Sequence, residues 1–458
     1  MKKAILVLPT LFIALYFFRY AGLGLRADFT HDDLMNMWRS LEQPYPEILA
    51  DTVVFWRPAR TFRPVGGLVY KVFLDLFHLN PLPMRVFIYS ALLVNLFLLY
   101  MLALRLTGSR LAGALAALLF AYHPGFGNIY FSSGMLYDVF CFTFSFACLW
   151  FYVQVRHSGK QLGSLQLLFF LFLLVLALDS KEMALALPIL IGLYELLYHP
   201  PDLLARRAVA PVLGAAAAAA YYFGRVAGKG GLAQNAAYAP VISLAQYLKQ
   251  TGLYLDQLFL KNDWFTAWRT AGFLLILVAV AWFVRSDTLK FSVCVFAAGI
   301  LPVAFIPARS LTAVYIPVAG LALYGATLLA LGRERLPKCK PCGIILFALV
   351  AVCLIRVLPG ADGQFASWQK EYGPIRAMMT QLPRLHPTLP RGTTILVVKD
   401  PFGDEYNWAS LFITCLVYRD PYVRLDRLQP KLAKYDIRLA YEDGRWRDLP
   451  AGEVPVRR

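Results

Sequence analysis

Long apolar runs separated by polar loops fill the first 360 residues of this chain. The runs are continuous rather than alternating, so they predict membrane helices and not the strands of an outer-membrane barrel. A helix of about 20 residues crosses the hydrocarbon core of a bilayer, and the runs therefore predict about 11 transmembrane helices. The expected spans lie near residues 4–18, 83–105, 110–123, 133–155, 162–178, 183–198, 208–224, 270–285, 289–306, 311–331 and 343–359.

Two long loops interrupt this pattern, at residues 24–82 and 225–269. Within the first loop, Met35–Leu41 and Val65–Phe77 carry apolar residues at helical spacing. Short amphipathic helices of this kind lie in the plane of the membrane interface. The sequence thus predicts a first loop that is partly helical and rests against the bilayer.

A more polar segment follows the last span, at residues 360–458. Trp368–Leu382 and Tyr406–Tyr418 have helical spacing, whereas Thr393–Lys399 is a short apolar run typical of a buried strand. We therefore expect two domains: a transmembrane domain at 1–359 and a small soluble α/β domain at 360–458.

Composition supports the membrane class. Hydrophobic residues make up 59% of the chain and charged residues 16%, and the mean hydropathy is +0.55. The net charge is +17, but residues 360–458 hold 15 Lys and Arg against 12 Asp and Glu. The remaining excess lies between the apolar runs, where it indicates topology signals and attraction to anionic lipid or phosphate rather than to nucleic acid.

The basic residues alternate from loop to loop. With the N-terminus inside, the inside loops hold the cations and the short outside loops hold almost none, as the positive-inside rule requires. This arrangement places the C-terminus and both long loops outside, on the periplasmic side of an inner membrane. Met1-Lys-Lys followed by Ala4–Phe18 also resembles a signal peptide, but the bulky residues after it favour an uncleaved first span.

The seven cysteines do not form a disulfide framework. Cys339 and Cys342 form a single CxxC pair, and zinc needs four ligands. We expect no metal or redox role there, and packing roles for the cysteines in apolar runs.

The first loop opens with an acidic cluster at residues 26–36, directly after the first span. It contains Asp28, His31, Asp32 and Asp33. Adjacent carboxylates repel, so one of them holds a raised pKa and is suited to accept a proton. The same three carboxylates could instead hold a divalent cation such as Mg²⁺ or Mn²⁺, or form an ordinary solvated acidic loop.

Arginines follow in the same loop, at Arg57, Arg60 and Arg63. A guanidinium presents a planar fork of donors suited to phosphate, and neighbouring aromatic side chains can hold a sugar face or an apolar chain. The alternative is contact with lipid headgroups, which is about as plausible for Arg57 as phosphate binding and less so for the other two.

Other charged residues stand at the outer ends of later spans. Asp138 begins the span at 133–155, and a lone carboxylate there requires a partner or a function. Lys181 and Glu182 stand between two spans, either as a plain turn or as a site at which lysine neutralises a lipid phosphate. Arg309 and Tyr315 mark a further outer boundary.

Together these motifs resemble the GT-C superfamily of integral-membrane glycosyltransferases, in particular protein O-mannosyltransferases, their relatives with tetratricopeptide repeats, and aminoarabinose transferases. The resemblance covers roughly residues 1–330. It is carried by Asp32-Asp33, Arg63-Pro64, Asp138, Lys181-Glu182 and the Arg309 to Pro317 element, in this order.

The resemblance implies an inverting transfer of a sugar from a polyprenyl-phosphate donor to an acceptor hydroxyl outside the membrane. By carry-over Asp32 is the catalytic base, Asp33 orients the acceptor and Asp138 shapes the acceptor side. The mannosyltransferases usually have Asp-Glu where this chain has Asp-Asp, so the identity of the base stays open and Asp28 remains a candidate.

The resemblance also implies phosphate ligands. Arg63, Lys181 and Arg309 are the residues it points to, with Arg60 beside them and with His31, Glu182 and Tyr315 as neighbours in the site. No repeat domain or lectin-like insertion is present, and the acceptor could be a protein, a glycan or a lipid.

Two other classes share some of these features. A transporter or flippase for a lipid-linked sugar would need the basic groove but no base, and it often shows inverted repeats and charges at mid-bilayer. A membrane assembly factor would use residues 361–458 to recruit partners. Only the enzyme should lose all activity when Asp32 becomes Asn.

Overall fold

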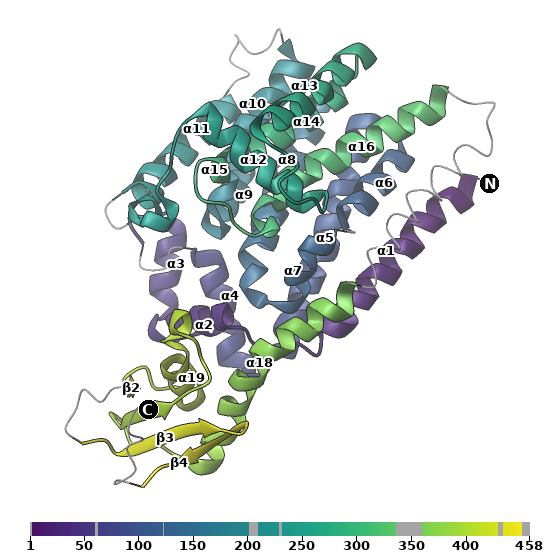
Figure 1. Ribbon diagram of the computed structural model, residues 1–458. Helices are drawn as coiled ribbons and strands as arrows, with labels where there is room; N and C mark the ends of the chain where they lie inside the picture. The colour runs from purple at the N-terminus through teal and green to yellow at the C-terminus, as the bar shows by residue number, and fades with distance from the viewer. Residues whose placement is uncertain are drawn as a thin grey trace.

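The computed structural model describes residues 2–59, 63–121, 123–200, 209–228, 231–335, 360–428 and 434–450. Within these ranges the chain is mostly helical (Figure 1). Six helices are long and apolar enough to cross a membrane: Pro81–Thr107, Ser133–His157, Val209–Val226, Ala267–Val284, Asp287–Ala304 and Leu311–Arg333. Leu11–Gly24, Arg110–Ala121 and Ser164–Ser180 are shorter apolar helices.

The expected spans that fall on described residues coincide with helices, although not every run forms one unbroken helix. The run at 183–198 is divided into a 3-10 turn, η3 (Glu182–Ala186), and helix α10 (Leu187–Tyr198), because Pro188 favours the first turn of a new helix. The run at 343–359 lies outside the described residues, as do Cys339, Cys342 and Cys353, so the count of 11 stays a prediction.

The other helices of this part are α1 (Lys2–Gly24), α5 (Pro81–Thr107), α6 (Arg110–Ala121), α7 (Gly127–Phe131), α8 (Leu136–His157), α9 (Ser164–Ser180), α11 (Val209–Tyr221), α12 (Leu244–Leu258), α13 (Ala267–Val284), α14 (Asp287–Gly299), α15 (Leu301–Ala304) and α16 (Tyr315–Arg335).

The first loop is helical, as its spacing predicts, and contains one helix more than expected. Its helices are α2 (His31–Glu42), α3 (Tyr45–Val53) and α4 (Pro64–Phe77). Prolines at or beside the N-termini of α3 and α4 set their starts, because proline fits the first turn, where no amide donor is needed. In Figure 1 this loop lies between the helical bundle and the C-terminal segment.

The C-terminal segment forms a helix and a small sheet. Helix α18 (Gly360–Leu385) leads into β1 (Thr394–Lys399), α19 (Ala409–Tyr418), β2 (Arg424–Arg427), β3 (Ile437–Glu442) and β4 (Arg445–Asp448). The sheet order is β2-β1-β3-β4, in which β1 is parallel to β2 and β3. Asp443 and Gly444 both have positive φ and close the antiparallel β3–β4 hairpin, as a type I′ turn requires.

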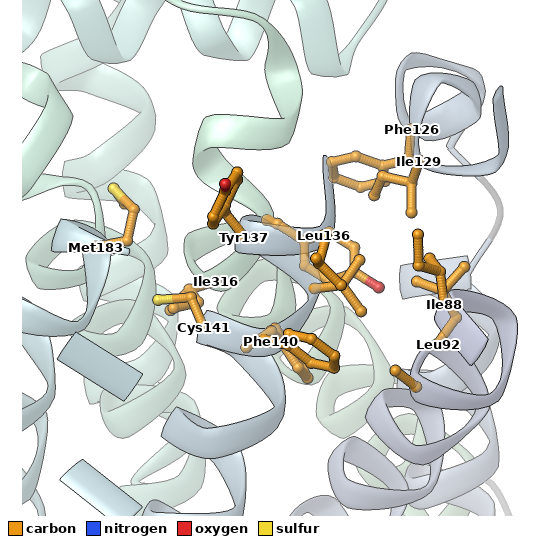
Figure 2. Packing of buried hydrophobic residues seen from close by; sticks show 14 of the residues in the cluster. Ile88, Leu92, Phe126, Ile129, Leu136, Tyr137, Phe140, Cys141, Met183 and Ile316 are labelled. Carbon is orange, nitrogen blue, oxygen red and sulfur yellow. The ribbon is translucent and has the colours of Figure 1, made fainter. Parts of the chain in front are cut away.

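A single buried cluster joins the bundle, the first loop and the C-terminal segment. Figure 2 shows part of it, with side chains from α5, α7, α8, η3 and α16, among them Ile88, Leu136, Met183 and Ile316. Because the same core reaches all three parts, the acidic cluster at the start of α2 is held from several sides.

Candidate active site

The acidic cluster lies at the N-terminus of α2, and the local sequence explains why the helix begins there. Thr30 is the N-cap, and Asp33 is the third helical residue. The Thr30 amide donates to Asp33 Oδ2 at 2.9 Å, while the Asp33 amide donates to Thr30 Oγ1 at 3.4 Å. This reciprocal pair is a capping box, which satisfies amides that a helix terminus otherwise leaves without partners.

Asp33 is fully buried and its carboxylate is surrounded by donors. Tyr70 donates to Oδ1 at 2.9 Å, the Ser133 amide donates to Oδ2 at 3.3 Å, and Arg85 lies 3.7 Å away with no exposed side-chain surface. Burial raises the pKa of Asp33, against the opposing effect of Arg85 and these hydrogen bonds. A carboxylate enclosed in this way holds the loop together and has little room for a substrate.

Asp32 has the opposite environment. Its side chain is exposed, and among the described residues none donates a hydrogen bond to its carboxylate. It lies over Gly134, where an added Cβ would be 3.0 Å from the Asp32 Cβ. Although Asp32 is exposed, partial desolvation raises its pKa, and the charges of Asp33 and Glu371 raise it further while His31 lowers it. An open carboxylate with a raised pKa has the properties of a general base.

The other two acidic-cluster residues are bound to the C-terminal segment. Asp28 forms an ion pair with Arg376 of α18, and its backbone carbonyl accepts from Arg85 at 2.6 Å. His31 is buried, and its Nδ1 lies 2.9 Å from Glu371. The Asp28 carboxylate is therefore paired, unlike that of Asp32, and the His31 ring is held by Glu371.

The carboxylates do not combine into a metal site. No group of three or more His, Cys, Asp and Glu side chains lies close enough to hold a metal ion in the part of the chain that the structure describes. The Asp33 oxygens already accept from the protein, and Asp28 is paired with Arg376. The donor set for Mg²⁺ or Mn²⁺ is therefore not assembled among the described residues of this cluster.

Two of the cations expected to bind phosphate, Arg63 and Lys181, are paired with carboxylates. Arg63 donates from Nε and Nη2 to Glu182 at 3.2 and 2.8 Å. Lys181 donates to Asp138 at 2.6 Å, in the first turn of α8. These four charges form one compact group, and each buried carboxylate has a cation beside it, as burial requires.

Tyr137 connects the cationic group to the acidic cluster. Its hydroxyl donates to Asn36 of α2 at 2.9 Å, and the Arg63 guanidinium lies over its ring at 5.3 Å from the centroid. Helix α4 approaches this ring closely at Gly66, where an added Cβ would lie 2.1 Å from Tyr137 Cε1. Tyr137 thus links α2, which carries Asp32, to the cationic group.

A small apolar cavity lies between α8, η3, α10 and α16. Ser145, Leu149, Met183, Leu187 and Ile316 are among the side chains that line it. Asp138, Ser145 and Leu149 are spaced by seven and four residues, so they share one face of α8. Seven helical residues rise by about 10 Å, which is the separation of Ser145 from Asp138 along the axis of α8.

Three expected site residues are not placed in this group. The Arg309 guanidinium lies over the ring of Tyr238 in the second long loop, 3.9 Å from its centroid. The backbone amide of Arg309 donates to the Tyr254 hydroxyl at 3.0 Å. Tyr315 is buried among Phe120, Phe126 and Phe142 and packs as part of the aromatic core. Arg60 lies outside the described residues.

Several residues that sequence reasoning did not select complete the site. Arg85 stands in the second turn of the long apolar helix α5, where a cation is itself a signal of function or pairing. Tyr70 and Tyr137 carried no such signal. Asp179 and Arg225, both without exposed side-chain surface, form an ion pair at 2.8 Å that anchors Arg225 against the Asp51 and Val54 carbonyls.

Comparison with known proteins identifies the fold. No protein-family model and no curated protein sequence matches the chain. The structure is similar to that of ArnT from Cupriavidus metallidurans bound to undecaprenyl phosphate, with a TM-score of 0.55 and 13% identity over 95% of this chain and 96% of ArnT. At this identity the likeness shows the fold alone, which is similar to that of ArnT over nearly the whole of both chains.

Proposed function

We propose that this protein is an inverting glycosyltransferase that moves a sugar from a polyprenyl-phosphate donor to an acceptor hydroxyl. The observation that carries the proposal is the contrast within the acidic pair: Asp33 is enclosed by donors, and Asp32 beside it is open. A transporter or an assembly factor needs no such base. The likeness to a GT-C fold supports the same reaction class.

In the proposed reaction, Asp32 accepts the proton of the acceptor hydroxyl as that oxygen attacks the anomeric carbon. The bond from this carbon to the donor phosphate breaks on the opposite face, so the anomeric configuration inverts in a single displacement. Lys181 and Arg63 stabilise the charge of the departing lipid phosphate, which is the largest electrostatic change of the reaction. Asp138 and Glu182 hold these two cations in place until the phosphate binds.

We place the first part of the lipid chain at the small apolar cavity between α8, η3, α10 and α16, whose lining must move apart to admit it, because the cavity itself has room for about one water molecule. Its lining is almost entirely apolar, as a polyprenyl chain requires, and it begins on the same face of α8 as Asp138. The structure of ArnT holds undecaprenyl phosphate, which supports a donor of this chemical class here.

We propose that the reaction takes place on the outer, periplasmic face of an inner membrane, with the N-terminus in the cytoplasm. The distribution of Lys and Arg among the loops supports this orientation. It places the first loop, residues 225–269 and residues 360–458 on the same side as the acceptor.

The test uses purified protein in nanodiscs with a panel of radiolabelled polyprenyl-phosphate sugars. Sugar released to water or passed to added hydroxyl acceptors is measured for wild type, Asp32→Asn and Asp28→Asn, together with donor binding. Turnover that disappears in Asp32→Asn and persists in Asp28→Asn supports the proposal. Donor binding without turnover, equal in all three proteins, would instead indicate a carrier of lipid-linked sugars.

A further inference from the structure

Helix α18 is joined to the rim of the candidate active site along one face. Trp368 donates to Asn128 at 3.2 Å, Tyr372 donates to the Phe131 carbonyl at 2.5 Å, and Arg376 pairs with Asp28. Glu371 lies three residues after Trp368, beside this face, and contacts His31. The C-terminal segment is thus bonded to the segment that contains Asp32.

Glu371 makes the contact nearest to Asp32. Its Oε1 accepts the backbone amide of His31 at 3.1 Å and lies 2.9 Å from His31 Nδ1, which donates because an ionised carboxylate only accepts. His31 is the first residue of α2, so this amide is one that the helix itself leaves without a partner. Glu371 therefore adds a second cap, from a distant part of the chain, to the helix that presents Asp32.

The imidazole of His31 is held on its face as well as its edge. Tyr406 stacks on it at 3.8 Å between ring centroids and 7° between planes, and Phe402 and Trp408 present their rings at right angles to it. With its ring stacked and its edge bonded, His31 has one position, and the adjoining Asp32 is held with it.

We propose that Glu371, acting through His31, is a positioning residue for Asp32, so that residues of the C-terminal segment form part of the active site. This inference rests on the proposed role of Asp32 as the base. Geometry of this kind matters because a displacement of about 1 Å at the reacting group can lower a rate by roughly 100-fold.

The charge of Glu371 gives the proposal a second signature. The titratable groups that face Asp32 are Asp33 and His31 on its own helix, Tyr137 on α8, Glu371 on α18, and Tyr406 on the loop before α19. The negative charge of Glu371 raises the pKa of Asp32. Removing that charge lowers the pKa, so the base stays ionised to a lower pH and the acid limb of the rate profile moves down.

The experiment compares Glu371→Ala and Glu371→Gln with a matched control, Glu42→Gln, which neutralises an exposed carboxylate at the other end of α2. Turnover against pH is measured together with hydrogen exchange of the amides at residues 28–40 in nanodiscs. We expect Glu371→Ala to lower kcat by roughly 10- to 100-fold with the KM for the donor unchanged, and to speed exchange at the start of α2. Glu371→Gln keeps an oxygen that accepts both bonds, so it should restore slow exchange and shift only the acid limb.

Each outcome decides the inference. Wild-type exchange and a wild-type pH profile in both Glu371 variants would overturn it, and so would equal effects in Glu42→Gln. If Glu371→Ala does not fold, the pH profile and exchange of Glu371→Gln carry the decision. If the wild-type protein turns over no donor, the proposed function fails, and hydrogen exchange alone still shows whether Glu371 positions the segment that contains Asp32.

Discussion

The acidic and cationic halves of the candidate site handle their charges in different ways. In the acidic half, one carboxylate is enclosed by Thr30, Tyr70, Ser133 and Arg85, and the neighbouring one is open. In the cationic half, Arg63 and Lys181 are already bound to carboxylates of the protein. The acidic half presents its reactive group before any substrate arrives, whereas the cationic half must exchange one partner for another.

This difference follows from the cost of burying charge. A buried cation without a partner is strongly destabilising, so a phosphate site between apolar helices needs counter-ions when it is empty. An exposed base has no such requirement, because water solvates it. A donor phosphate would therefore compete with Asp138 and Glu182, and its affinity would be the difference between two sets of ion pairs.

The largest effect is expected from Asp32→Asn, which removes the open carboxylate and keeps its shape. Turnover should fall by roughly 10²- to 10⁴-fold, the usual contribution of a general base, with donor binding unchanged. Single-turnover kinetics with a saturating donor measure it. A loss confined to donor affinity would contradict the division into two halves.

Asp33→Asn should act on stability and much less on the chemistry. It leaves Arg85 as a buried charge without its carboxylate and replaces one acceptor oxygen by a donor, which is expected to cost about 3 kcal/mol of the free energy of unfolding. Thermal unfolding in nanodiscs checks this. A stable variant without activity would make Asp33 the base instead.

Lys181→Met tests the exchange of partners in the cationic half. Donor affinity should fall by roughly 10- to 100-fold, since one charged hydrogen bond to phosphate contributes about 1.5–3 kcal/mol. The variant is also destabilised, because Asp138 is left buried and alone. The double variant Lys181→Met/Asp138→Leu should recover stability and not donor affinity, and recovery of both would remove Lys181 from the phosphate site.

The pH dependence of turnover tests the acidic half of the site. Asp32 acts as a base only when ionised, so the rate falls as pH drops through its pKa. Since that pKa is raised, the acid limb should lie above the ordinary value for aspartate of about 3.9. A limb at or below the ordinary value would contradict the environment assigned to Asp32.

Gly66→Ala is expected to have the smallest effect on turnover. Gly66 packs on Tyr137, the residue that joins the acidic and cationic halves. The new Cβ would meet the Tyr137 ring, which must move away from Arg63 and Asn36. Turnover should fall by no more than about tenfold, less than the roughly 100-fold that a displaced reacting group can cost. Gly22→Ala is the control, because nothing lies within 4 Å of an added Cβ there.

Much of the fold and half of the site could be predicted because their signals are local. The spacing at Met35–Leu41 and Val65–Phe77 predicted helices that α2 and α4 confirm, and Thr393–Lys399 predicted β1. The acidic pair could be found because Asp32 and Asp33 are adjacent in the sequence. The strands β2 to β4 were missed, since they are short and partly exposed and carry little periodicity.

The other half depends on contacts between distant residues. Arg63 meets Glu182 across 119 positions, and His31 meets Glu371 across 340, so no local pattern reveals either pair. Arg309 and Lys181 look alike in sequence, as single cations at an outer boundary. Only their neighbours, Tyr238 for the first and Asp138 for the second, distinguish them.

The attachment of α18 to His31 has a consequence for how the protein is made. Ribosomes deliver the N-terminal spans and the acidic cluster to the membrane long before residue 371 exists. A chain halted in the later spans would already have its N-terminal spans inserted, but helix α2, which carries Asp32, would lack its second cap. If Glu371 positions the base, activity appears only after synthesis of the last hundred residues, so unfinished chains are inserted without being active.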